Sequence, residues 1–435
     1  MRRLDHPAVR LGISTLILFT GWAADSWRNL IGWYGFGAVV LVMVTGSVLL
    51  VVRNRRRLTL NTLPVPLMAF LALAALSIAW SFYPLSSLLG VTLTALTTLC
   101  ALAVALTLSW DELLRVLGWV FRAILGLSYL FELVVSLVFR QPIFPVWMLG
   151  SIPDDPAKLL YWSRNLLLEG GKIQGIVGNS SLLAMVAIVG LVVFAIQLAS
   201  KTVRPIPGLF WIAVALGTIA ITRSATVFIA LGVVAVIAVV ALVVRRVSGT
   251  RAAIPTRVAL FVGLAGLAVA ALVLRAPLLA ALGKSDTLTG RLGIWEAVIG
   301  LAEQRPAAGW GWVSWWAPWA APFDHLIRRG GVQVLHAHNA WLDVWLQLGV
   351  IGLIVFGAFI VSTLVRSWQF ATDRVRTAVD SEGAYRYVTL LPLLVLSAQL
   401  VQSLAESRIL VEGGWMLLVV FAVMTKSGRV SAQPA

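Results

Sequence analysis

A histidine followed by a fixed pattern of small residues is the feature of this sequence that most directly suggests chemistry. His338 precedes Asn339, nine residues separate that asparagine from Gly349, and Gly352 follows after two more. With glycine near 7% of positions, this arrangement arises by chance at roughly one histidine in a thousand. A neutral imidazole, with an ordinary pKa of ~6.5, can accept a proton at ambient pH. We therefore predict that His338 is a catalytic base.

Two arginines stand where positive charge is unusual, and they are the predicted partners of His338. Arg223 lies in AITRSATVF, at an expected outward-facing turn between two apolar runs, where positive charge is disfavoured. Arg291 opens an expected helix in TGRLGIW, where its guanidinium and the helix N-terminal amides can face one anion. Two guanidinium groups can hold a diphosphate without a metal. This combination predicts transfer from a pyrophosphate-activated donor to a hydroxyl, with the arginines stabilising the departing diphosphate.

Other polar residues are secondary candidates for this site. No paired-aspartate motif of the kind that holds a divalent ion for glycosyl transfer is evident, so we expect neither a metal nor another cofactor. Asp154 and Asp155 are adjacent, but such a pair in a loop is usually a solvated turn. His336 is a second candidate for the base. The remaining candidates are Asn339, Arg164, Lys172, Arg275, Arg328 and Arg329.

Composition places these residues in a membrane protein. Of 435 residues, 60% are hydrophobic and only 12% are charged, with a mean hydropathy of +0.93, whereas soluble domains have roughly 45–50% apolar and ~25% charged residues. The net charge of +16 is spread over short breaks between apolar runs, so it indicates topology rather than nucleic-acid binding. The single cysteine, Cys100, excludes an internal disulfide and a multi-thiolate metal site.

About twelve apolar runs approach the ~20 residues needed to cross hydrocarbon. Their basic flanks predict that both termini are cytoplasmic and that the chain is a multi-pass protein of the cytoplasmic (inner) membrane. The predicted spans are 8–24, 33–52, 63–80, 88–108, 112–139, 176–199, 207–222, 225–244, 258–274, 339–365, 386–404 and 409–425. The expected organisation is five spans in 1–139, an external loop in 140–175, four spans in 176–274, a large external loop in 275–338, and three spans with a cytoplasmic tail in 339–435.

The two external loops are too long to be simple connections. In the larger one, residues 287–306 predict a helix, with a threonine to cap it at 287 or 289 and Pro306 after its end. A tryptophan-rich stretch follows at 310–319. Because amphipathic indoles favour the headgroup level, this stretch is expected to lie on the membrane, either as an anchor or as a wall for a lipid-linked or sugar substrate.

Several of these motifs together resemble the O-antigen ligase and polymerase superfamily of bacterial envelope glycan enzymes. The ligase pattern is met by His338, Asn339, Gly349 and Gly352. Arg223 in TRSA and Arg291 in GRLGIW are similar to the arginines before and inside the family's last long external loop, and the segments 77–84 and 174–184 are similar to further family landmarks.

The resemblance implies an all-α, GT-C-like membrane fold that acts on an undecaprenyl-diphosphate-linked glycan at the periplasmic or external face. The implied reaction is metal-independent and inverting. Ligases transfer the glycan to an acceptor such as lipid A-core, polymerases extend a repeat-unit chain, and other relatives glycosylate proteins. The ligase is favoured modestly, and the identities of the glycan and acceptor stay open.

A transporter for a lipid-linked anion is the competing class of function. Such a protein would use Glu132, alone in an apolar run, as a proton-coupling group. Transporters place their polar residues near the bilayer midplane. The candidate residues here gather at one predicted face of the membrane, which favours an enzyme.

Overall fold

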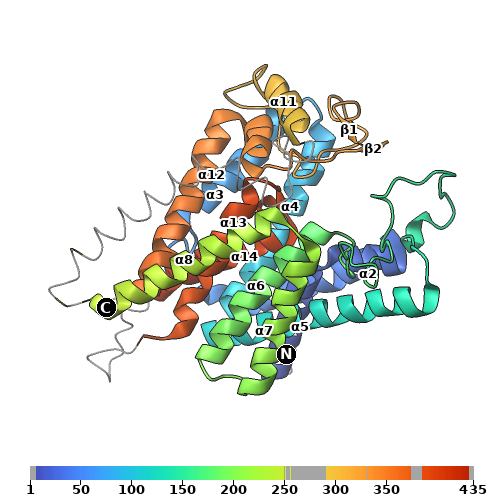
Figure 1. Ribbon diagram of the computed structural model, residues 1–435. Coiled ribbons are helices and arrows are strands. Elements are labelled where there is room, and N and C mark those ends of the chain that lie inside the picture. Colours follow the sequence, from blue (N-terminus) through green and yellow to red (C-terminus); the bar gives the residue numbers. More distant parts are fainter. Residues whose placement is uncertain are drawn as a thin grey trace.

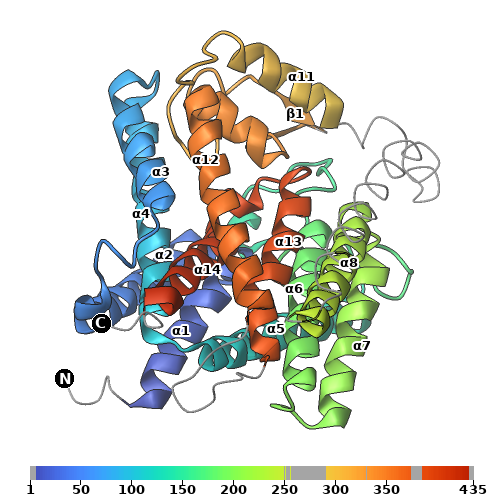
Figure 2. The same cartoon turned by 90° about the vertical axis from the view of Figure 1, so that its left-hand side faces the viewer.

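The computed structural model describes residues 6–248, 250, 255, 291–329, 331–373 and 385–430. Helices form nearly all of the regular structure in these residues (Figures 1 and 2). Strand β1 (Arg328–Arg329) pairs antiparallel with β2 (Val332–Gln333). The helices are α1 (Pro7–Trp22), α2 (Ala24–Arg53), α3 (Val65–Leu76), α4 (Pro84–Thr107), α5 (Trp110–Val134), α6 (Ser180–Ala199), α7 (Pro205–Thr222), α8 (Ala225–Val247), α11 (Arg291–Ala302), α12 (Ala340–Thr372), α13 (Leu391–Ser403) and α14 (Glu412–Val430), with short 3₁₀ or π segments between several of them.

The helix bundle has the composition of a membrane domain. Seven of the described helices are long and apolar enough to cross a bilayer, and three shorter apolar helices accompany them. Large apolar side chains such as Leu41 and Ile354 face outward, 68% and 66% exposed, as expected for a surface solvated by lipid. The chain is therefore an all-helical polytopic membrane protein. Every predicted span overlaps a described helix except 258–274, which lies outside the described residues; the number of crossings stays a prediction.

The most buried helices run through the middle of the bundle. Nearly every residue of α14 from Trp415 to Met424 is buried, and α6 is almost as enclosed. Figure 2 shows α13 and α14 between the α3–α4 pair and the α6–α8 group. Side-chain caps fix where some helices begin: Asn179 accepts the backbone N–H groups of Ser181 and Leu182 at the start of α6. Asparagine is a preferred residue at this position because it satisfies otherwise unpaired amides.

Contacts between helix ends show which ends share a face of the bundle. At the end of α8, Arg245 donates to the carbonyl of Ala371 (2.5 Å) and to the hydroxyl of Thr389 (2.6 Å). These two residues lie at the end of α12 and just before α13. The beginning of α12 and the end of α13 lie together at the opposite end, where the indole N–H of Trp341 donates to the hydroxyl of Ser403, and α8 begins toward that same end.

A small folded unit covers that opposite end. Helix α11 and the β1–β2 pair lie beside the upper end of α12 in both views (Figures 1 and 2). Its own core includes Val298, Trp316 and Phe323, each at most 1% exposed. Trp312, also fully buried, packs against Phe70 of α3 instead. The expectation that the tryptophan stretch lies on the membrane is therefore wrong for Trp312 and Trp316. The indoles of these two residues are buried in the protein core instead.

Helix α12 is kinked at Gly349, the first glycine of the histidine motif. Gly349 has φ +65°, and a Cβ there would lie 2.1 Å from the carbonyl oxygen of Ala307. Beyond the kink, the N–H groups of Val350 and Ile351 donate to the carbonyls of Pro306 and Ala307. The motif glycine thus lets the chain after α11 pack against the helix backbone, since only glycine combines this φ with so close an approach.

Candidate functional site

A buried carboxylate joins the predicted base to one of the two predicted arginines. Nδ1 of His338 lies 3.0 Å from Oε2 of Glu406, and a terminal nitrogen of Arg291 lies 2.8 Å from Oε1 of the same carboxylate. Both contacts span different elements: His338 precedes α12, Arg291 begins α11, and Glu406 follows α13. All three side chains are largely buried, with 14–24% exposure. The fold therefore assembles a histidine–glutamate–arginine group from distant parts of the chain.

The charge of Glu406 decides which nitrogen of His338 is available. Burial alone would raise the pKa of this carboxyl, but the hydrogen bond with His338 and the electrostatic interactions with His338, His336 and Arg291 outweigh it and lower the pKa to about 2. Glu406 is then an anion that can only accept hydrogen bonds. Nδ1 of His338 must carry the proton of that contact, which leaves Nε2 of the neutral ring as the proton acceptor.

The backbone around His338 is held in an uncommon conformation. His338 has φ +49°, and its N–H donates to Nδ1 of His336 at 3.1 Å. Asn339 caps α12 by accepting the N–H groups of Trp341 and Leu342, and its amide reaches the carbonyl of Leu404 at 3.4 Å. Left-handed conformations of residues other than glycine persist where surrounding contacts enforce them, often at functional sites. The asparagine of the motif thus has a structural role that also ties α12 to the Glu406 loop.

Asp343, in the first turn of α12, connects three segments that form the site. Its Oδ1 accepts from the indole N–H of Trp316 at 2.8 Å, and Oδ2 accepts from the N–H of Ala337 at 3.0 Å and from the hydroxyl of Ser407. Ala337 immediately precedes His338, and Ser407 immediately follows Glu406. This fully buried carboxylate therefore fixes the spacing between His338 and Glu406 and is a positioning residue.

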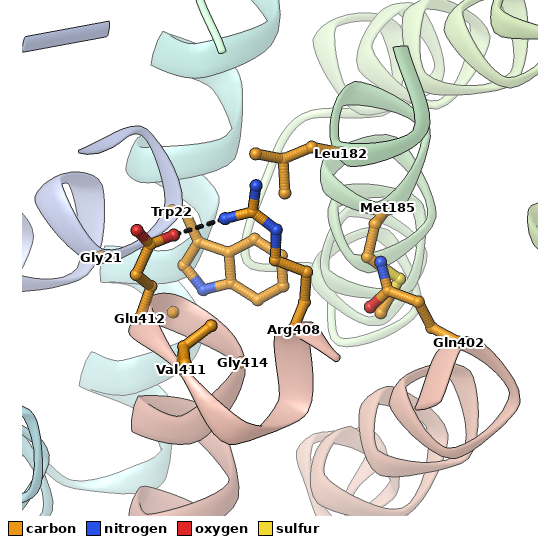
Figure 3. A pocket seen from close by; sticks show the side chains of 10 residues that line it. Gly21, Trp22, Leu182, Met185, Gln402, Arg408, Val411, Glu412 and Gly414 are labelled. Atoms are coloured by element: carbon orange, nitrogen blue, oxygen red, sulfur yellow. Dashed lines mark hydrogen bonds and ion pairs between the residues drawn. The ribbon is translucent and has the colours of Figure 1, made fainter. Parts of the chain in front are cut away.

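Arg408 lies beside this group but is held by acids on the other side. Figure 3 shows its guanidinium directed at Glu412, whose carboxylate is 2.6 Å away. Asp25, at the start of α2, is 3.8 Å from it. The cavity that Arg408 and Glu412 line together with Trp22 measures about 10 Å³, which is room for one water rather than for a sugar. Arg408 thus links the loop before α14 to the junction of α1 and α2.

Arg223, the other predicted arginine, contacts none of these groups in the part of the chain that the structure describes. It follows the last residue of α7, adopts φ +47° and is exposed. Because α8 begins at the same end as α12, Arg223 shares that face with His338. Within the described residues no hydrogen bond or ion pair engages its side chain. Its predicted contact with the diphosphate stays a prediction.

The secondary candidates lie at varied distances from the histidine. Arg164 donates to the side chain of Gln174 and to the carbonyl of Lys172, within the other external segment. Arg328 is exposed on β1. Arg275 and the side chain of Arg329 lie outside what the structure describes. His336 and Asn339 adjoin His338 in the described structure, and no finding tests a role in binding for any member of this set.

Two histidines and Glu406 also form the kind of cluster that can hold a metal. Potential ligand atoms of His336, His338 and Glu406 all lie within 4.8 Å of one another. Two imidazoles and a carboxylate suit a zinc-like ion. However, one carboxylate oxygen of Glu406 already accepts a hydrogen bond from Arg291. Burial is the main cause that lowers the pKa of His336, and the positive charges of Arg408 and Arg291 lower it further. The same positive charges oppose the binding of a cation. The arrangement fits an internal ion-pair group better than a resident metal.

The sequence reasoning did not identify Glu406, Asp343 or Arg408. A signal for them was present: the segment 403–414, between two apolar runs, contains Glu406, Arg408 and Glu412 at the predicted outer face. Asp343 was visible as the only acid in the apolar run that follows His338. Neither signal says which acid meets the histidine, because that depends on how α13 packs against α12.

Glu132, the residue on which the transporter alternative depended, has structural partners. Its carboxylate accepts the hydroxyl of Ser163 at 2.8 Å and the backbone N–H groups of Gln174 and Gly175 at 2.9 and 2.7 Å. It is 1% exposed. A carboxylate surrounded by backbone amides anchors the external segment and explains the buried acid without proton coupling.

Comparisons with known proteins identify one family and one relative that part of this chain resembles. Residues 209–357 match the O-antigen ligase family, a stretch that contains Arg223, Arg291 and His338. The chain is also 31% identical over 88 residues to the exopolysaccharide production protein ExoQ of Rhizobium meliloti (strain 1021). That match covers 20% of this chain and 20% of the relative, so the chain aligns with only a fifth of the relative's length. The two matches support the resemblance of this chain to the O-antigen ligase and polymerase superfamily.

Proposed function

We propose that this protein transfers a glycan from a polyprenyl diphosphate donor to an acceptor hydroxyl at the outer face of the cytoplasmic membrane. The observation that carries the proposal is the contact of His338 and Arg291 with opposite oxygens of Glu406. It combines a histidine poised to accept a proton with a guanidinium suited to a diphosphate. The membrane-embedded bundle, with this group at one end, supports a substrate that combines a lipid chain with a charged head.

The proposed reaction is a single displacement. The acceptor oxygen forms a bond to the anomeric carbon while the bond from that carbon to the donor phosphate oxygen breaks, which inverts the anomeric configuration. The acceptor proton passes to Nε2 of His338, and the diphosphate leaves with the bonding electron pair. Glu406 stabilises the resulting imidazolium, as a buried acid does for a histidine base.

Charge on the leaving diphosphate is neutralised by arginines rather than by a metal. A guanidinium has five N–H donors, so Arg291 can keep its contact with Glu406 and still offer donors to a phosphate oxygen. Arg223 supplies the second guanidinium after a movement of its exposed side chain. Because both groups are permanently charged, the reaction requires no divalent ion.

A second candidate is polymerisation, in which the acceptor is another glycan chain. It is favoured by the match to a protein of exopolysaccharide production. The chemistry at His338 is unchanged, and only the acceptor differs. Lipid A-core remains the acceptor expected for the ligase.

Purified protein in lipid nanodiscs, given a polyprenyl-diphosphate glycan and either acceptor in the presence of EDTA, tests the proposal. We expect transfer to persist in EDTA, to be lost in His338→Ala, and to fall at least about 100-fold in Arg291→Ala. His325→Ala, which alters an exposed histidine of the same external unit, is the matched control and should retain activity. Undiminished transfer by His338→Ala would remove His338 from the mechanism, and loss of transfer in EDTA would require a metal.

A further inference from the structure

One tryptophan of the external unit differs from its neighbours in having an unengaged indole N–H. The indoles of Trp312 and Trp316 are buried and donate to Thr94 and Asp343, respectively. Trp310 donates to the carbonyl of Leu301, and the exposed Trp319 donates to Ser86. Trp315 is partly exposed, and across the described residues no acceptor engages its indole N–H. Its side chain is therefore not explained by core packing alone.

Trp315 stands beside the histidine pair. Its ring centroid is 4.6 Å from that of His336, in an edge-to-face arrangement, and the His336 ring is 4.0 Å from that of His338. The guanidinium carbon of Arg408 lies 5.2 Å from the Trp315 ring. A molecule that contacts the exposed part of this indole is therefore separated from the predicted base, His338, only by the width of the His336 ring.

The backbone before Trp315 is fixed by α12. Ser314 has φ +66°, an unfavourable conformation for a residue with a side chain. The buried side chain of Gln347 holds it there, because its oxygen accepts from the N–H groups of Val313 (2.8 Å) and Ser314 (3.0 Å) and its nitrogen donates to the carbonyl of Ser314 (3.3 Å). The position of Trp315 is thus set in advance of ligand binding, and preorganisation favours recognition.

We propose that Trp315 forms a sugar subsite next to His338. A pyranose ring presents aliphatic C–H groups that pack on the electron-rich surface of an aromatic ring, and its hydroxyls can accept the free indole N–H. The inference rests on the proposed glycan transfer and names a residue that selects the sugar. The pyranose belongs either to the donor glycan or to the acceptor, since both must meet at His338.

Initial rates with donor and acceptor varied in turn test the subsite. We expect Trp315→Leu, which keeps an apolar side chain but no aromatic ring, to raise KM about tenfold for one substrate while kcat changes less than threefold. Trp315→Phe should recover most of this loss. The substrate whose KM rises identifies the source of the sugar. Trp319→Leu, in the same loop and 68% exposed, is the matched control and should leave both KM values within twofold.

The outcomes separate failure of the subsite from failure of the proposed function. If Trp315→Leu leaves both KM values within twofold while His338→Ala abolishes transfer, the subsite is wrong and the reaction stands. Equal losses in Trp315→Leu and Trp315→Phe, with kcat reduced and KM unchanged, would also overturn the subsite. If wild-type protein transfers no glycan under any condition, the proposed function itself fails. Calorimetry then still tests the subsite, because Trp315→Leu should weaken the binding of either the donor glycan or the acceptor glycan.

Discussion

The two segments predicted to be external are each joined to the helix bundle by a glutamate, but the partners of the two acids differ. Glu132 binds a hydroxyl and two backbone amides of the segment 163–175. Glu406 binds two ionisable side chains, Arg291 and His338, at the unit that contains α11. Backbone amides cannot change charge, whereas an imidazole can gain a proton. Two glutamates that both join distant segments therefore have different capacities for chemistry.

Basic residues show the same contrast. Arg164 donates to groups within its own segment, whereas Arg291 crosses to a loop 115 positions away. Both occur in long polar loops of similar composition. Their sequence neighbourhoods alone therefore do not separate a structural arginine from one beside a histidine.

Glu406→Gln tests the contrast with the largest expected effect. Glutamine keeps the size of the side chain but removes the charge that fixes the His338 tautomer and stabilises the imidazolium. We expect the rate of glycan transfer per folded molecule to fall about 1,000-fold, together with a lower melting temperature because Arg291 loses its ion pair. Single-turnover rates and thermal unfolding in nanodiscs measure the two quantities. A loss of transfer that only follows loss of folded protein would make Glu406 structural, like Glu132.

Gly349→Ala probes the packing that holds the external unit containing α11 on α12. The added Cβ would meet the Ala307 carbonyl at 2.1 Å in a left-handed conformation, so we expect the free energy of unfolding to fall by about 3 kcal/mol. Thermal unfolding measures the change. Gly357→Ala, on the same helix with open space around it, is the matched control and should be neutral. Equal stability of the two variants would show that the kink does not require glycine.

Glu132→Gln is expected to have a smaller effect that acts through stability alone. An amide accepts hydrogen bonds with only one oxygen, so part of the anchor of the segment 163–175 is lost, at about 1–3 kcal/mol. Transfer per folded molecule should stay within twofold of wild type. A specific loss of transfer at unchanged melting temperature would give Glu132 a role in chemistry and revive the proton-coupling alternative.

His336→Gln is expected to have the smallest effect, visible in the pH dependence of stability. Burial is the main reason why the pKa of His336 lies well below 6.5. Electrostatic interactions with His338, Arg408 and Arg291 lower it further, whereas the negative charge of Glu406 raises it. As pH falls below 6.5 the unfolded state binds a proton that the folded state does not, so this residue lowers stability by at most about 1.4 kcal/mol per pH unit. The melting temperature of His336→Gln should therefore fall less than that of wild type between pH 7 and 5. A parallel decline of the two proteins would contradict the lowered pKa.

Much of the helical architecture could be predicted from apolar runs, because each membrane helix satisfies its own backbone and needs a long hydrophobic stretch. The helix expected over 287–306 overlaps α11, and the span expected from 339 overlaps α12, so both helices were also visible in the sequence. Two features were not. The kink at Gly349 depends on the loop that packs there, and Trp312 and Trp316 look like interfacial residues until the fold encloses them.

The sequence by itself determined that the protein is a polytopic membrane protein, and it predicted that His338 stands in a motif resembling that of a known family and that Arg291 lies in a helix. Only the tertiary structure decided that Glu406 lies between them, that Asp343 sets their spacing, and that Arg164 is occupied elsewhere. Hydropathy and capping depend on residues within one helix, so both can be recognised in a local stretch of sequence. The partner of a side chain from a distant loop is decided by which helix ends meet, and that follows from the packing of the whole bundle.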